Sequence, residues 1–164
     1  MAPSLASFAQ YFRIGLEAGI CEPEQARDWA IAVIDQMEEP PGEIIEVSWH
    51  KPTAQLISDL NEIKGEPDVD LVRKWLLGAL SEAMDATSDS LGQTVRQAIM
   101  VARVLGPTDL YSELDTIEDE LQLAHAGTYG TVDACRRELK NVLDESGTSP
   151  FTCEEVQADN APQR

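Results

Sequence analysis

The chain has little positive charge. Its 164 residues include 12 Lys and Arg against 30 Asp and Glu, which gives a formal net charge of −18 at pH 7. Affinity for nucleic acid comes largely from Lys and Arg that neutralise phosphates, so this balance argues against unassisted binding to nucleic acid and disfavours anionic membranes for the same reason. The excess of negative charge is compatible with a basic protein partner, or serves only to keep the protein soluble.

Long apolar runs and signal-like features are also missing. No stretch approaches the roughly 20 apolar residues that span a bilayer. The first ten residues carry no basic segment and no unbroken apolar run, so they do not indicate a signal peptide. The three cysteines, Cys21, Cys135 and Cys153, are an odd number without a C-x-x-C spacing. We therefore expect a cytoplasmic protein with reduced thiols and no membrane association.

Residue patterns that carry chemistry are scarce. The two histidines, His50 and His125, belong to no zinc-binding spacing, and the Glu-x-x-His pairs of di-metal bundles are absent. Phosphate-binding glycine loops and the hydrolase nucleophile elbow are absent as well. Cys21 precedes a helix whose dipole would lower its pKa, but Glu22 and Glu24 oppose this, so we interpret it as a buried or boundary cysteine. We predict no metal, no cofactor and no enzymatic activity.

What the chain does have is helical periodicity. Hydrophobic residues make up 43% of it, enough for a core in a domain of this length. We expect a single helical domain over 1–146 and a flexible C-terminal tail over 147–164, where the periodicity is lost. The expected fold is an all-α antiparallel bundle of about six to seven helices, with stacked helix pairs as the alternative arrangement.

Glycine, proline and capping residues predict where these helices begin and end. Gly19 suits a left-handed C-terminal cap, Pro23 suits the first turn of a helix, and Asp68 and Asp109 suit N-caps. The stretch 43–49 alternates like a strand, but no other segment offers it a strand partner, so we predict a short helix. The expected segments are 4–18, 23–37, 43–49, 53–64, a helix from Asp68 whose apolar residues run to Ala83, a helix from Ser88 or Ser90 to 105, 109–126 and 131–145.

Acidic residues gather in two clusters. No Lys or Arg occurs between Arg103 and Arg136. Like charges four residues apart on a helix are unfavourable by about 0.2–0.5 kcal/mol per pair, and a basic partner would relieve this repulsion. A merely solvated helix face is the alternative. The candidate partner-binding residues are Glu113, Asp115, Glu118, Asp119 and Glu120, with Glu38, Glu39 and Glu43 near the Pro40-Pro41 turn as the second set.

One part of the chain resembles a known pattern. The residues that carry it are Gly19-Ile20-Cys21, Trp29-Ala30-Ile31, Ile34-Asp35, Pro40-Pro41 and Ile44-Ile45-Glu46-Val47-Ser48. Over about residues 12–60 the chain resembles small helical bacterial immunity proteins of polymorphic toxin systems, although Val47 stands where their pattern usually has leucine. The resemblance implies a cytoplasmic antidote that binds a cognate toxin and blocks its active site or substrate surface. It assigns no binding residue.

These observations lead to one main hypothesis and two alternatives. The main hypothesis is a non-enzymatic immunity protein that occludes a basic toxin domain, such as a nuclease. An acidic adaptor or secretion-type chaperone is the first alternative, and it would need a large exposed apolar groove and usually a dimer. The second is a helical enzyme whose site combines scattered carboxylates.

Overall fold

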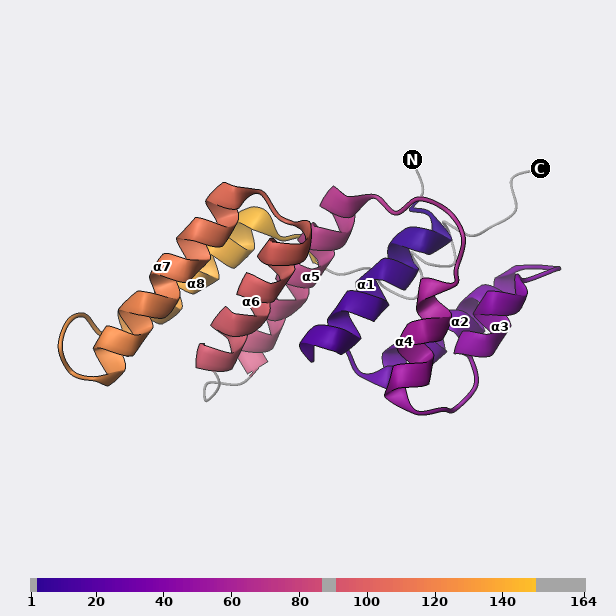
Figure 1. The fold of residues 1–164 in the computed structure, drawn as a ribbon, viewed down its shortest axis with the longest axis horizontal. Helices are drawn as coiled ribbons and strands as arrows, with labels where there is room; N and C mark the ends of the chain where they lie inside the picture. Colours follow the sequence, from indigo (N-terminus) through magenta and orange to yellow (C-terminus); the bar gives the residue numbers. More distant parts are fainter. Residues whose placement is uncertain (1–2, 87–90, 150–164) are drawn as a thin grey trace. The chain divides into compact units, whose positions relative to one another are not determined.

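The computed structural model describes residues 3–86 and 91–149, and these contain eight α-helices and no strand (Figure 1). The predicted all-α fold is confirmed. Each of the eight segments predicted individually corresponds to one helix, so the bundle has one helix more than the upper number of about six to seven expected for it. The helices are α1 (Leu5–Ala18), α2 (Pro23–Gln36), α3 (Gly42–Val47), α4 (Thr53–Asn61), α5 (Val69–Ala86), α6 (Leu91–Leu105), α7 (Thr108–His125) and α8 (Val132–Ser146).

The helices group into two compact units. The described residues up to Val72 belong to the first unit, and those from Arg73 belong to the second, so the boundary falls within α5 after its first turn. The single domain predicted over 1–146 stays a prediction. Of the predicted tail, 147–149 are described, while 150–164 and the predicted helix start at Ser88 or Ser90 lie outside the described residues.

In the first unit, α1 packs against α2 and α4, and α3 packs against the same two helices. Its core contains an aromatic cluster in which the rings of Phe8 and Phe12 lie 5.9 and 5.5 Å from that of Trp29, centroid to centroid. Helix α1 ends at Gly19, whose φ of 76° is the predicted left-handed cap. The predicted short helix after the two prolines is present as α3.

The start of α5 is held by two hydrogen bonds in the first unit. The Asp68 backbone N–H donates to the Ser7 hydroxyl over 2.8 Å. The Asp68 carboxylate accepts from the Leu71 N–H over 3.2 Å, which confirms the predicted N-cap. Ser7 is completely buried, so its hydroxyl serves as the internal partner of this helix start.

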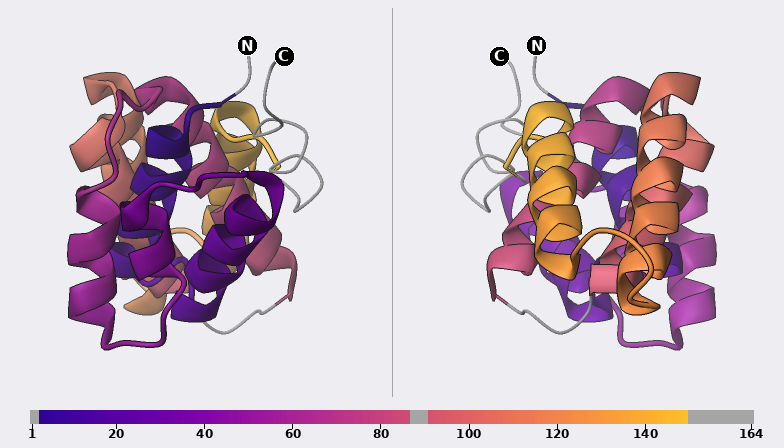
Figure 2. Two further views of the ribbon diagram at one scale, coloured as in Figure 1. Left: turned by 90° about the vertical axis from the view of Figure 1, so that its right-hand side faces the viewer. Right: turned by 90° about the vertical axis from the view of Figure 1, so that its left-hand side faces the viewer.

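The second unit contains most of α5 together with α6, α7 and α8. Helix α7 packs against α6 on one side and α8 on the other. Figure 2 shows α7 and α8 side by side, joined at one end by a short loop. Helix α8 is also tied to α5, because the Lys140 ammonium donates to the Ser81 carbonyl over 2.9 Å and to its hydroxyl over 2.7 Å.

One predicted cap is wrong. Helix α7 has Pro107 as its N-cap, and Asp109 lies inside the first turn. Proline disfavours a helical conformation in the residue before it, Gly106, so the helix restarts directly after Pro107, and its N-cap lies two residues earlier than predicted. Asp109 still lies where the helix dipole favours a carboxylate.

Candidate functional site

The candidate site lies on the hairpin formed by α7, the connector 126–131 and α8. Each helix buries an apolar stripe at three- and four-residue steps: Leu110, Leu114, Ile117 and Leu121 on α7, and Cys135, Leu139, Val142 and Leu143 on α8. Gly127 and Gly130 have φ of 71° and 73°, which suits glycine and lets the chain reverse. Thr131 then caps α8, its hydroxyl accepting from the Ala134 N–H over 3.1 Å. The hairpin leaves one flank of each helix facing a shared groove.

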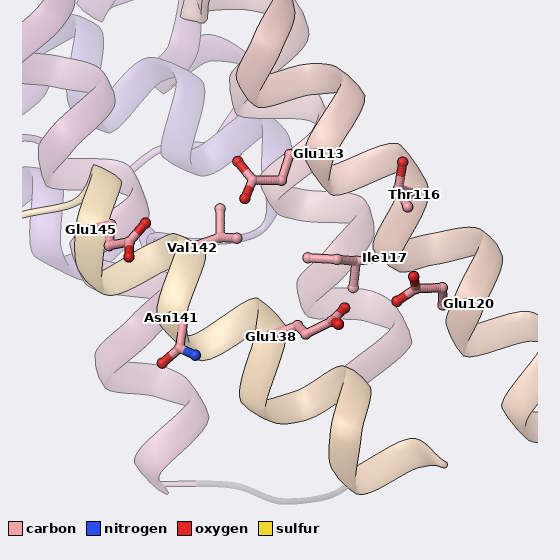
Figure 3. Close-up of a pocket in the computed structure, with 8 residues that line it drawn as sticks. All are labelled: Glu113, Thr116, Ile117, Glu120, Glu138, Asn141, Val142 and Glu145. Atoms are coloured by element: carbon pink, nitrogen blue, oxygen red, sulfur yellow. The ribbon is translucent and has the colours of Figure 1, made fainter. Parts of the chain in front are cut away.

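This groove has a volume of about 420 Å³ and is open to solvent (Figure 3). The buried side chains of Ile117 and Val142 line it between the two helices. The rest of the lining is four glutamates and two neutral polar residues: Glu113, Thr116 and Glu120 from α7, and Glu138, Asn141 and Glu145 from α8. The groove therefore combines an apolar base with anionic sides.

The two sides of the groove repeat one spacing. On α7, Glu113 is followed three residues later by Thr116 and four residues after that by Glu120. On α8, glutamates at 138 and 145 flank Asn141 in the same way. Because the helices are antiparallel, Glu120 lies near Glu138 at one end of the groove, and Glu113 lies toward Glu145 at the other (Figure 3). Each end of the groove therefore has two carboxyl groups.

The carboxyl groups of one of these pairs, Glu120 and Glu138, interact with each other. A hydrogen bond with the Glu138 carboxyl group raises the pKa of Glu120, and burial and the charge of Glu138 raise it further. Two carboxyl groups can form such a bond only when one of them is protonated. Burial raises the pKa of the nearby Cys135 thiol, with Glu120 and Glu138 adding to the effect. Glu120 therefore binds a proton more readily than an ordinary glutamate does.

The structure divides the five predicted residues of α7 between two places. Glu113 and Glu120 line the groove. Asp115, Glu118 and Asp119 lie outside it, where the two aspartates are exposed and Glu118 is partly exposed. None of the ion pairs formed within residues 3–86 and 91–149 uses a carboxylate of α7.

Sequence reasoning missed the α8 side of the groove. Glu138, Asn141 and Glu145 follow Arg136 and Arg137, which end the stretch without Lys or Arg, so a search by charge run stops before them. The signal that could have found them is the repeated spacing, a glutamate pair seven residues apart with a neutral polar residue between. Reading that signal requires knowing which flanks of α7 and α8 face each other.

The second predicted cluster is partly neutralised. Glu43 lines an open groove of about 380 Å³ between α3 and α4, together with Gly42, Glu46, Asp59 and Glu62. Lys51 pairs with Asp59, and its ammonium lies 3.5 Å from the Glu46 carboxylate. Glu38 and Glu39 are exposed in the bend between α2 and α3 and do not line this groove. Of the two acidic clusters, the one on α7 has fewer basic neighbours.

The other reactive side chains that the structure describes are two histidines and the buried Cys21. Cys21 is buried, as interpreted from the sequence, and this burial raises the pKa of its thiol to about 11. His50 and His125 are both exposed. In the part of the chain that the structure describes, no three His, Cys, Asp or Glu side chains are placed to hold a metal ion.

No described helix is both long and apolar enough to cross a bilayer. No protein family, curated protein or solved structure matches this chain.

Proposed function

We propose that this protein is an acidic, non-enzymatic binding protein that covers a functional surface of a basic protein. The more specific proposal is an immunity protein that occludes a cognate toxin domain, such as a nuclease, in the cytoplasm. One observation carries the proposal: the α7–α8 hairpin holds a dense set of carboxylates, and those of α7 form no ion pair within the described residues.

The energetics of the hairpin favour a basic partner. Helix α7 carries six Asp and Glu and no Lys or Arg. Its carboxylates repel one another, and the charge of Glu138 contributes to the raised pKa of Glu120 in the groove. A partner that brings Lys or Arg into the groove would replace this repulsion with attraction. Because this electrostatic free energy is gained only in the complex, it would increase the affinity of the complex.

The charge also bears on the rate of association. Complementary potentials steer two proteins together and can raise the association rate by orders of magnitude at low ionic strength. A fast, tight complex is what an inhibitor of a toxic enzyme requires. A nuclease surface that binds phosphates is basic, and an array of carboxylates matches it in sign.

The partner is identified first. A tagged full chain is used to capture proteins from a lysate of the native cells at low and at moderate salt, and the bound proteins are identified by mass spectrometry. We expect one dominant basic partner that is released by salt. Many weakly bound proteins, or none, would contradict the proposal.

The contact surface is tested with two variants of equal charge. One replaces Asp115, Glu118 and Asp119 with Lys, and the other replaces Glu38, Glu39 and Glu43 with Lys. Each variant makes the net charge six units more positive. A difference in association rate between the two variants therefore depends on where the charges lie and not on the total charge. We expect the α7 variant to associate with the captured partner at least about tenfold more slowly at low salt, by stopped-flow fluorescence. Equal rates for the two variants would show that α7 is not the contact surface.

The chaperone alternative has no structural observation in its favour. Such a protein would present a large exposed apolar surface. The exposed large apolar side chains among the described residues belong to several separate elements: Ile31, Trp49, Val69, Val104, Leu123 and Tyr129. The two glutamate-lined grooves, between α7 and α8 and between α3 and α4, are anionic.

A further inference from the structure

Two of the exposed apolar side chains lie close together at the tip of the α7–α8 hairpin. Tyr129 is 74% exposed and Leu123 is 42% exposed. The backbone N–H groups of Thr128 and Tyr129 both donate to the Leu123 carbonyl, over 3.0 and 3.4 Å. These bonds hold the connector against the last turn of α7, so both side chains project from the same small region.

Leu123 departs from the apolar pattern of its helix. The buried stripe of α7 continues through Ile117 and Leu121, whereas Leu123 lies in the row of Thr116 and Asp119, on the exposed side. Amphipathic patterning places a polar residue at such a position. The exposed 42% of Leu123 is apolar surface left in water, which is unfavourable.

The connector turns so that Tyr129 lies at its exposed end. Gly127 and Gly130 flank Thr128 and Tyr129, and both glycines have a positive φ that other residues rarely adopt. Tyrosine has only two side-chain torsions and a large apolar area, so ordering it on binding costs little entropy. Tyrosine is also enriched among the residues that dominate binding energy at interfaces.

The negative charge around the hairpin tip indicates which kind of partner surface could bind there. Asp119 and Glu120 precede the tip in sequence and Asp133 follows it, with Arg136 and Arg137 one turn further along α8, so acidic residues are the nearest charged ones on both sides. A second copy of this chain would bring the same negative charge. The segment 150–164 of the chain, with three carboxylic residues and one arginine, is also net negative. Charge complementarity therefore points to an apolar patch with a basic rim on a different protein.

We propose that Leu123 and Tyr129 form an apolar anchor that docks onto an apolar patch rimmed by Lys or Arg in the partner. This inference rests on the proposed function, because it names the chemistry of the partner surface that the hairpin contacts. The carboxylates beside the anchor pair with the basic rim, and the anchor fills the apolar centre.

Two synthetic helical peptides test the proposal with the full chain. Both carry the same number of arginines. The leucine peptide has a leucine stripe between them, and the alanine peptide has alanines at the same positions. We expect the wild-type protein to bind the leucine peptide about tenfold more tightly at low salt, by fluorescence anisotropy. Leu123→Ser and Tyr129→Ser should each remove most of this preference and leave binding of the alanine peptide unchanged.

Trp49→Ser and Val104→Ser are the matched controls, because these side chains are 56% and 54% exposed and lie elsewhere on the chain. They should keep the full preference, and thermal melts followed by circular dichroism should show that all four variants fold. Equal binding of the two peptides by the wild-type protein, or loss of the preference in the controls, would overturn the anchor. Failure of both peptides to bind would count against the anchor and also against the proposed binding of basic partners.

Discussion

Glu120 and Glu138 link the stability of the hairpin to pH. Because their hydrogen bond raises the pKa of Glu120 in the folded protein, the folded state binds more protons than the unfolded chain at pH values between the unfolded and folded pKa. The stabilising contribution of this pair is therefore fully present below the unfolded pKa of a glutamate. It is lost as the pH rises through the higher folded pKa.

Replacing Glu138 with Gln should remove this pH dependence. The glutamine amide can donate to the Glu120 carboxylate, which favours the charged form and ends the repulsion. We expect Glu138→Gln to be more stable than the wild-type protein at pH 7, by only a few tenths of a kcal/mol, because Glu138 is exposed and Glu120 is only partly buried. The advantage should shrink as the pH falls toward 4. Urea unfolding between pH 4 and 7 measures it.

Glu145→Gln is the control for this prediction. It removes a carboxylate from the same helix and the same groove, but at the end away from Glu120 (Figure 3). The wild-type difference in stability between mildly acidic and neutral pH should persist in this variant. If Glu145→Gln flattens the pH profile as much as Glu138→Gln does, the effect arises from the total charge of the groove.

Cys21 shows how burial settles the role of a single side chain. The dipole of the following helix would lower the pKa of a thiol, and the nearby acidic residues would raise it. In the structure, burial raises the pKa of Cys21 to about 11, and the hydrogen bond with Tyr11 lowers it only in part. The thiol is therefore protonated at neutral pH, as expected of a core residue and not of a nucleophile.

At the scale of elements, the chain that follows α8 crosses α5 at very short distance. The Thr148 N–H donates to the Lys74 carbonyl over 3.0 Å. A Cβ added at Gly78 would lie 1.6 Å from the Thr148 carbonyl oxygen, and one at Gly147 would lie 2.6 Å from the Gly78 nitrogen. Both contacts involve backbone atoms, so only glycines allow this crossing.

We therefore expect Gly78→Ala to destabilise the protein by at least about 2 kcal/mol, since the methyl group must displace backbone and not a flexible side chain. This loss would exceed the gain of up to about 1 kcal/mol that alanine brings to a helix. Gly92→Ala in α6 is the control, because its Cβ would meet only the Arg96 guanidinium at 3.5 Å and Leu121 at 4.0 Å. Gly92→Ala should be neutral or stabilising in urea unfolding, and an equal loss in both variants would refute the crossing.

The elements were predictable to the extent that local residues determine them. Gly19 ended α1 as expected, and 43–49 was assigned to a helix because a lone strand would leave its backbone groups without partners. The N-cap of α7 lies two residues earlier than predicted, because Pro107 occupies the cap position expected for Asp109. The α8 side of the groove was missed because it depends on how two helices are rotated against each other. Periodicity defines the buried stripe of each helix but not which flank meets a neighbour.

At the scale of the whole molecule, the net charge of −18 is the dominant property. Charges of one sign in a compact chain repel one another more strongly than in the expanded unfolded chain, so the excess destabilises the folded state. This cost is concentrated in α7, where the carboxylates form no ion pair within the described residues. A basic partner would lower it by binding, and dissolved salt lowers it by screening.

The protein should therefore become more stable as salt is added. Raising NaCl from 10 mM to 0.5 M shortens the Debye length from about 30 Å to below 8 Å, which screens repulsion between exposed carboxylates. We expect the Tm at pH 7 to rise by roughly 2–4 °C, the shift that about 1 kcal/mol produces in a protein of this size. The rise should be smaller in the variant with Lys at positions 115, 118 and 119, because that variant carries less repulsion to screen. Differential scanning calorimetry of both proteins measures the two Tm shifts. A wild-type Tm that falls as salt is added would contradict the prediction, because it would mean that attractive charge pairs, and not repulsion, dominate the folded state.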